Sequence, residues 1–157
     1  MMRSLILVAL TVLLASCSSE PSKSPAAAVT PAPPPKPVDE SRRFPQANLL
    51  GTEVVSDHLL GKAFMPGGTL AHYRKGKVEY DLFVAQLATP TDAAIALLDW
   101  SKALTNADLI ASFGGYAGQD AGRPVFVFTK GRWIAGVAGL PQKQADPQAR
   151  VLAAHLD

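Results

Sequence analysis

The amino-acid sequence predicts an α+β domain: an antiparallel sheet built from two β-hairpins, with two helices packed on one face of the sheet. Two observations lead to this class. Runs of apolar and β-branched residues flank a Lys-Gly pair at positions 75–76 and another at 130–131, as expected of strands joined by short turns. Each of these stretches is followed by a proline-containing segment whose apolar residues recur at helical spacing.

The first hairpin is expected around HYRKGKVEYD, residues 72–81. A two-residue turn at Lys75-Gly76 would set Tyr73 opposite Val78 and His72 opposite Glu79. Strand alternation then directs one set of side chains toward the core: Ala71, Tyr73, Val78, Tyr80, Leu82 and Val84. The other face would be polar and exposed, with His72, Arg74, Lys77, Glu79 and Asp81.

The second hairpin is expected in PVFVFTKGRWIAGVAG, residues 124–139, with its turn at Lys130-Gly131. This register places Phe128 opposite Trp133 and Val127 opposite Ile134. A cross-strand aromatic pair of this kind stabilises a sheet by about 0.2–1 kcal/mol.

The two helices are expected within residues 88–104 and 145–157. Thr89 is a suitable N-cap for the first helix, Pro90 fits its first turn, and Asp92 completes a pattern like a capping box. Asp146 and Pro147 take the same places in the second helix. The predicted buried stripes are Ala94, Leu97, Leu98, Ser101 and Leu104 in the first helix, and Ala149, Leu152, Ala153 and Leu156 in the second.

The spacing of these elements suggests an internal duplication. The Lys-Gly turns are 55 residues apart, at glycines 76 and 131, and the two helix caps are 57 residues apart, at residues 89 and 146. A duplicated hairpin-plus-helix unit would explain this spacing. Coincidence between two common local motifs is the alternative.

The N-terminal segment combines Arg3 with an apolar stretch at residues 5–14, which is too short to span a bilayer. It ends in Leu14-Ala15-Ser16-Cys17, which resembles the lipobox of bacterial lipoprotein precursors. This resemblance implies that residues 1–16 are a lipoprotein signal peptide and that the thiol of Cys17 is acylated and anchors the protein to a membrane. The alternatives are a secretory signal cut elsewhere and an uncleaved anchor. Ser18 resembles the residue that follows the cysteine in lipoproteins of the outer membrane, so in a cell with two membranes we expect the protein there, facing the periplasm.

Residues 17–43 are expected to form a disordered tether after the lipidated cysteine. Residues 21–37 contain seven of the thirteen prolines, and no aromatic residue occurs between residues 18 and 43. The single globular domain is expected to comprise residues 44–157, with a short edge strand at residues 52–56 and a turn at residues 65–68.

The composition of residues 44–157 excludes several classes of function. Ten basic residues balance ten acidic ones, which argues against nucleic acid as a partner. No cysteine follows Cys17, so disulfides and thiolate metal sites are excluded from the domain. No motif indicates a metal or another cofactor.

The glycine-rich stretch FGGYAGQDAG, residues 113–122, is predicted to be an irregular connection between strands. It lacks the Gly-Lys-Ser/Thr sequence and the following helix that a phosphate-binding loop requires. Because loops often carry recognition, Tyr116, Gln119 and Asp120 are candidate binding residues.

His72, Glu79 and Asp81 are the other candidate site. A carboxylate beside an imidazole can orient it for general acid–base catalysis or metal binding. The alternative is an exposed set of cross-strand pairs on a polar sheet face, with Arg74 and Lys77 nearby.

Three segments, residues 63–73, 113–141 and 145–150, resemble an uncharacterised family of bacterial exported proteins, a likeness that implies no activity. The expected function is therefore a lipid-anchored, non-catalytic binding or accessory module of the cell envelope with an envelope protein as partner. A small envelope hydrolase or metal-dependent enzyme centred on His72, Glu79 and Asp81 is one alternative. A structural spacer between the membrane and another envelope component is the other.

Overall fold

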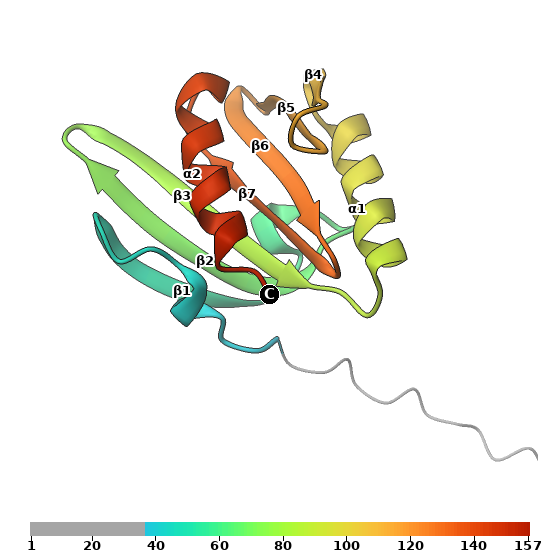
Figure 1. Ribbon diagram of the computed structural model, residues 1–157, viewed down its shortest axis with the longest axis horizontal. Helices are drawn as coiled ribbons and strands as arrows, with labels where there is room; N and C mark the ends of the chain where they lie inside the picture. The colour runs from blue at the N-terminus through green and yellow to red at the C-terminus, as the bar shows by residue number, and fades with distance from the viewer. Residues whose placement is uncertain (1–36) are drawn as a thin grey trace, which may run out of the picture. The chain divides into compact units, whose positions relative to one another are not determined.

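The computed structural model describes residues 37–157, which form one seven-stranded antiparallel sheet and two α-helices (Figure 1). The predicted α+β class is therefore confirmed. The expected signal peptide, Cys17 and most of the expected tether lie outside the described residues.

The strands form two meanders that meet at the centre of the sheet, in the order β1-β2-β3-β7-β6-β5-β4. Neither α-helix in residues 37–157 is both long enough and apolar enough to cross a membrane. The elements are η1 (Ser41–Arg43), β1 (Leu49–Asp57), η2 (Leu59–Gly61), β2 (Pro66–Lys75), β3 (Val78–Gln86), α1 (Pro90–Ala103), β4 (Thr105–Ile110), β5 (Gly115–Asp120), β6 (Arg123–Lys130), β7 (Trp133–Ala138) and α2 (Gln142–Ala154).

Both hairpins exist, but each turn lies one residue later than predicted. Lys75 pairs with Val78 and Lys130 pairs with Trp133, so each glycine is the first of the two turn residues. Gly76 and Gly131 have φ angles of 64° and 56°, whereas the residues that follow them do not have positive φ. This pattern matches a type II′ turn, which requires glycine at its first central position.

The later turn moves every cross-strand partner by two positions, so the side chains stay on their predicted faces. Val78, which was predicted to point into the core, is nevertheless 46% exposed. The predicted pairing of Phe128 with Trp133 is wrong, because Phe128 lies opposite Ala135. His72 likewise lies opposite Asp81 rather than Glu79.

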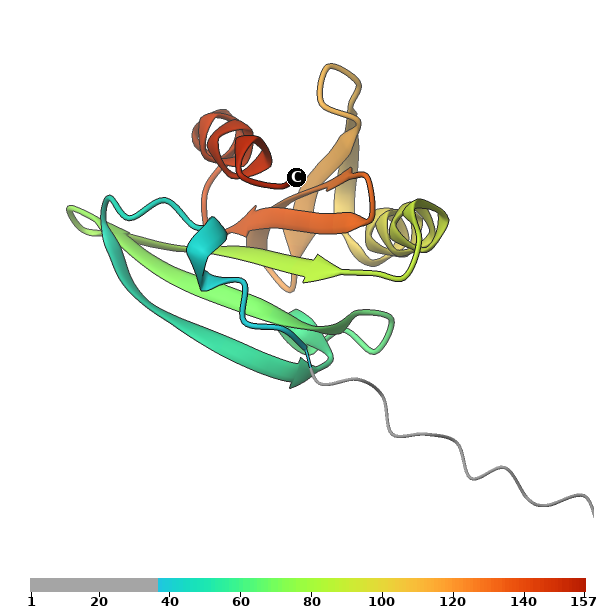
Figure 2. The same cartoon turned by 60° about the horizontal axis from the view of Figure 1, so that its bottom comes forward.

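The two helices cover opposite faces of the sheet, so the prediction that they share one face is wrong (Figure 2). Buried residues of α2 pack on a cluster that includes Tyr80, Phe126 and Phe128, and we call this side the α2 face. Trp100 of α1 packs on the other side, the α1 face, with Phe83 and other apolar residues. All six residues of β7 are buried, as expected of a strand that is covered on both sides.

The predicted duplication is not confirmed. β3 and β7 are antiparallel neighbours at the centre of the sheet, so a two-fold axis between them would be perpendicular to the sheet. Such an axis would place both helices on the same face. Their positions on opposite faces do not fit that symmetry.

Helix α1 begins as predicted but buries a different side. The Thr89 hydroxyl accepts a hydrogen bond from the Asp92 N–H at 3.1 Å, and the Asp92 carboxylate accepts one from the Thr89 N–H. Trp100 is fully buried and determines the rotation of the helix. As a result Leu98, which was predicted to be buried, is 50% exposed, and Ala94 is exposed as well.

Helix α2 begins at Gln142, four residues before the predicted N-cap, so the predicted capping role of Asp146 and Pro147 is wrong. Pro147 lies inside the helix and has no N–H to donate to the carbonyl of Lys143. Asp146 instead forms an ion pair with Arg150, at 2.9 Å. The buried stripe agrees largely with the prediction.

Residues 38–46, which we call the strap, pack on the α2 face. The backbone N–H of Glu40 donates to the Thr69 hydroxyl at 3.0 Å, and the Arg43 guanidinium lies 4.3 Å from the centroid of the Trp133 ring. Phe44 is buried in the core. A domain boundary at residue 44 would therefore cut through ordered contacts that include residues assigned above to the tether.

Candidate functional site

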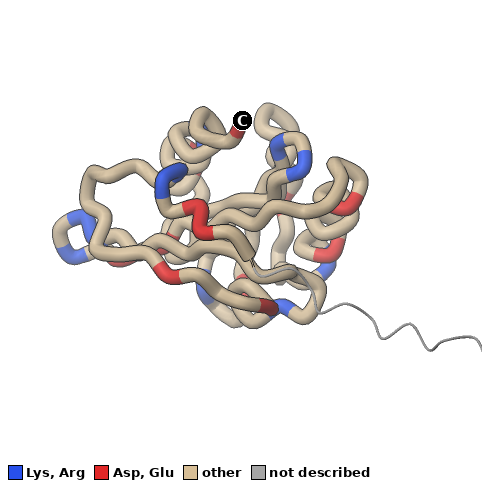
Figure 3. The backbone as a smooth tube through the Cα atoms, turned by 90° about the horizontal axis from the view of Figure 1, so that it is seen from below, with Lys and Arg blue, Asp and Glu red and all other residues tan. Residues whose placement is uncertain are grey.

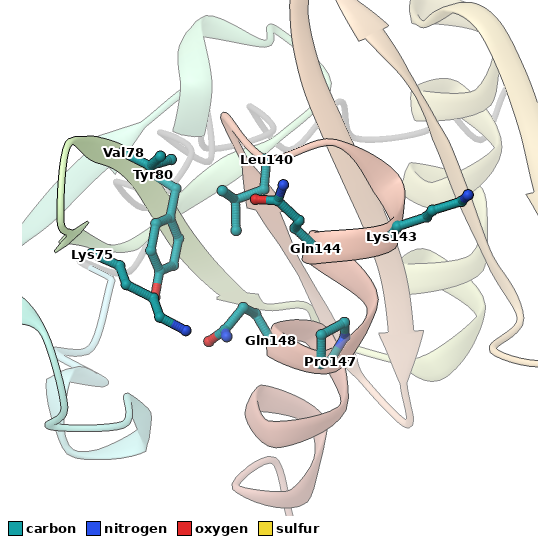
Figure 4. A pocket seen from close by; sticks show the side chains of 8 residues that line it. All are labelled: Lys75, Val78, Tyr80, Leu140, Lys143, Gln144, Pro147 and Gln148. Carbon is teal, nitrogen blue, oxygen red and sulfur yellow. The ribbon is translucent and has the colours of Figure 1, made fainter.

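A pocket of about 440 Å³ lies between the end of the β2–β3 hairpin and the first half of α2 (Figure 4). The hairpin contributes Lys75, Val78 and Tyr80. The opposite wall consists of residues at and near the start of α2: Leu140, Lys143, Gln144, Pro147 and Gln148. The lining therefore joins segments that are at least 60 positions apart in the sequence.

The register of the sheet creates this pocket. Pairing between β3 and β7 begins at Asp81 and Ala138, so the three preceding residues of β3, 78–80, extend beyond the end of β7 (Figure 1). After Ala138 the chain turns at Gly139, which has a φ of 98°, and enters α2. The start of α2 therefore faces the projecting end of the hairpin.

Two stacked tyrosines differ in how their hydroxyl groups are used. The rings of Tyr73 and Tyr80 lie 5.1 Å apart and nearly parallel. The Tyr73 hydroxyl donates a hydrogen bond of 2.7 Å to the carbonyl of Pro45 in the strap. The Tyr80 hydroxyl bonds to no residue that the structure describes, although Tyr80 is only 4% exposed.

The Tyr80 hydroxyl opens into the pocket. No buried polar side-chain atom in residues 37–157 lacks a hydrogen-bond partner, so this unbonded oxygen must be in contact with solvent. Figure 4 shows the hydroxyl pointing toward the side chains of Lys75 and Gln148. Burial raises the pKa of Tyr80, so the hydroxyl is protonated at neutral pH and can donate a hydrogen bond.

The mouth of the pocket is positively charged. Lys75 forms no ion pair with any described residue, and neither does Lys143, whose side chain extends away from Tyr80 (Figure 4). Basic residues gather at the hairpin turn, seen at one end of the molecule in Figure 3. The pocket lining contains no acidic residue and no histidine, serine or cysteine. It therefore offers hydrogen-bond donors and a positive charge for binding.

The predicted cluster of His72, Glu79 and Asp81 is divided by the register of the hairpin. His72 Nδ1 lies 2.7 Å from Asp81 Oδ1, whereas Glu79 accepts a hydrogen bond of 2.8 Å from Arg74 Nε. Arg123 of β6 donates to the second Asp81 oxygen at 2.6 Å. Within residues 37–157, no group of three histidine, cysteine or acidic residues could hold a metal ion.

The sequence did not identify Arg123 as a member of this cluster. It comes close to Asp81 only because β7, which separates β3 from β6 in the sheet, is short and ends at Ala138. No local pattern around Arg123 indicates this contact.

The predicted binding loop is a strand, β5, and its three candidates do not share a face. Tyr116 and Asp120 pair with residues of the α1 face, whereas Gln119 belongs to the α2 face. Asp120 forms an ion pair with Lys62. The glycines of this stretch permit close packing, because a Cβ at Gly115 would collide with the carbonyl of Val127.

Comparison of this chain with protein-family models, with curated proteins and with solved structures finds no match.

Proposed function

We propose that this protein is a lipid-anchored, non-catalytic binding module of the cell envelope, and that the pocket between the β2–β3 hairpin and α2 is its binding site. The observation that carries the proposal is the unused hydroxyl of Tyr80. Tyr80 as a whole is only 4% exposed, yet its hydroxyl meets solvent at the pocket rather than a protein group. The hydroxyl is therefore free to donate a hydrogen bond to a ligand.

The anchor rests on the sequence. The Leu14-Ala15-Ser16-Cys17 motif supports lipidation of Cys17. In a cell with two membranes, Ser18 supports a location at the outer membrane, with the domain facing the periplasm. Residues 18–36 separate Cys17 from the first described residue. At about 3.1 Å per residue, an extended proline-rich segment of this length reaches roughly 60 Å. The binding module could thus contact a partner well away from the bilayer.

A catalytic role centred on His72 is the second candidate, and the hydrogen bond between His72 and Asp81 supports it. The side chain of His72 is 42% exposed, so a substrate could reach it. Two contacts weigh against this role. Arg123 already neutralises Asp81, and Arg74 holds Glu79 away from the pair.

In-cell photocrosslinking separates the two candidates. The full-length lipoprotein carries a photocrosslinking amino acid at Val78, on the rim of the pocket, or at Leu50 on β1 as the matched exposed control. We expect mass spectrometry to find an adduct at position 78 that is absent at position 50 and that Tyr80→Phe abolishes. His72→Gln should leave the adduct unchanged.

Two results would contradict the binding module. One is labelling at position 78 no greater than at position 50. The other is a folded His72→Gln protein that loses the cellular function of the wild type while Tyr80→Phe retains it, which would establish the catalytic alternative.

A further inference from the structure

The pocket gathers hydrogen-bond donors and a positive charge but no negatively charged acceptor. The Tyr80 hydroxyl, the Lys75 ammonium group and the Gln148 amide converge in Figure 4. The side-chain acceptors of the lining are neutral, namely the amide oxygens of Gln144 and Gln148 and the Tyr80 oxygen, and the lining contains no carboxylate. A ligand that brings an anionic acceptor therefore gains most, because it lies beside an unpaired lysine.

Three of the other lining residues are apolar. Val78, Leu140 and Pro147 line the pocket together with Tyr80, and Val78 is 46% exposed although it is apolar. A volume of about 440 Å³ fits a small molecule or a chain end rather than a folded domain. The ligand that suits these walls carries an apolar body next to its charged group.

The donor set favours a carboxylate over a phosphate. Only one ammonium group, that of Lys75, points toward the Tyr80 hydroxyl, and no arginine lines the pocket. Sites for phosphate usually gather arginine forks, several lysines or a series of backbone N–H groups. One ammonium group and one hydroxyl match the single charge and two oxygens of a carboxylate.

We infer that this pocket binds small amphipathic carboxylates, with the carboxylate between Tyr80 and Lys75 and the apolar body against Val78, Leu140 and Pro147. This inference rests on the proposed binding function and names its ligand class. A fatty acid and the C-terminus of an apolar peptide share this chemistry.

Calorimetric titration with two anionic probes tests the ligand class. The protein is the chain from residue 17 to 157 with Cys17→Ser, which retains every described residue and needs no detergent. Octanoate represents a fatty acid and N-acetylphenylalanine a peptide C-terminus, and octanamide and N-acetylphenylalaninamide are their uncharged controls. We expect at least one acid to bind at least tenfold more tightly than its amide, and the acid that binds identifies the source.

The stacked tyrosines provide a matched pair of variants. Tyr80→Phe should weaken binding of the acid about tenfold, the effect of losing one hydrogen bond to a charged group. Tyr73→Phe removes the same atom from the neighbouring ring, but this hydroxyl is bonded to Pro45, so the affinity should not change. Lys75→Gln should reduce the salt dependence of the binding affinity. Lys77→Gln should change this salt dependence less, because Lys77 does not line the pocket.

Three results would overturn the inference: no saturable binding of either acid, equal affinity for acid and amide, or equal losses in Tyr80→Phe and Tyr73→Phe. These outcomes are distinct from a failure of the proposed function. An adduct at Val78 in cells without binding of either acid would refute the ligand class and retain the binding module. Binding of an acid without an adduct in cells would retain the ligand class and refute the binding module.

Discussion

Arg43 is expected to hold the strap on the domain, and its replacement by methionine tests this. Arg43 Nε lies 2.7 Å from Glu40 Oε2, and the two side chains are only 16% and 9% exposed. Arg43 also donates to the His155 carbonyl at 2.9 Å and lies over Trp133. The methionine variant keeps an apolar stem of similar length but leaves the Glu40 carboxylate without its main partner.

The magnitude follows from these contacts. Breaking a buried ion pair by removing one partner costs about 3–5 kcal/mol, and a cation–π contact contributes about 0.5–2 kcal/mol. Because this pair keeps some solvent contact, we expect the low end of the first range, about 3 kcal/mol of unfolding free energy. The double variant Glu40→Gln/Arg43→Met should recover part of this loss, since it removes the unpaired charge.

Arg42 is the matched control. Its side chain is 78% exposed and lies 3.8 Å from the same Glu40 oxygen. An exposed pair of this kind contributes about 0–1 kcal/mol, so Arg42→Met should cost far less than Arg43→Met. Urea unfolding monitored by tryptophan fluorescence measures both, because Trp133 lies beneath Arg43. Equal and small losses in the two variants would refute the reasoning and restore the domain boundary at residue 44.

Two further predictions concern the anchor and the sheet. Cys17→Ser should leave the protein unprocessed or in the soluble fraction, because the thiol is the expected acyl acceptor; recovery of a mature, membrane-bound variant at the wild-type level would refute lipidation. Gly136→Ala should cost at least about 3 kcal/mol in urea unfolding, since its Cβ would collide with the Phe126 carbonyl and the Phe83 ring, whereas Gly51→Ala meets no atom within 4 Å and should cost less than about 1 kcal/mol. Similar losses in the two alanine variants would contradict the packing described at β7.

The features that sequence analysis predicted correctly depend on neighbouring residues. The Thr89 cap needs only Asp92, three positions away, and strand alternation alone sorts the faces of the first hairpin. The burial of Tyr80 was also predicted correctly. These signals are short-range, and tertiary packing did not override them.

The predictions were wrong where contacts between residues distant in sequence determine the structure. Leu98 fits an apolar stripe, but the side of α1 that is buried is the one that carries Trp100, whose ring contacts Phe83 and Phe64, and this leaves Leu98 half exposed. The glycine-rich stretch around Gly115 resembles a loop in sequence, yet its glycines allow close contact with the neighbouring strand. No local pattern reveals this, because the space available for a side chain depends on residues that are remote in sequence.

The candidate site was missed for the same reason. Tyr80 could be assigned to the core from its alternation, but its hydroxyl lacks a partner because the strap reaches Tyr73 and not Tyr80. The wall of the pocket opposite Tyr80 exists because α2 begins at Gln142, whereas the position of Pro147 predicted a later start of the helix. Both facts concern how separate segments meet.

The pairing of β3 with β7 also shapes how the chain folds. Each meander consists of hairpins with short connections, whereas the nearest β3–β7 partners, Gln86 and Trp133, are 47 positions apart. Closing a loop of this length costs about 3.5 kcal/mol of chain entropy, so docking of the two meanders is the expensive, non-local step of folding. During synthesis, β3 stays without this neighbour until the chain has been extended by the 47 residues that separate Gln86 from Trp133. Until then an apolar strand edge is open to other chains, and refolding yield should fall as protein concentration rises.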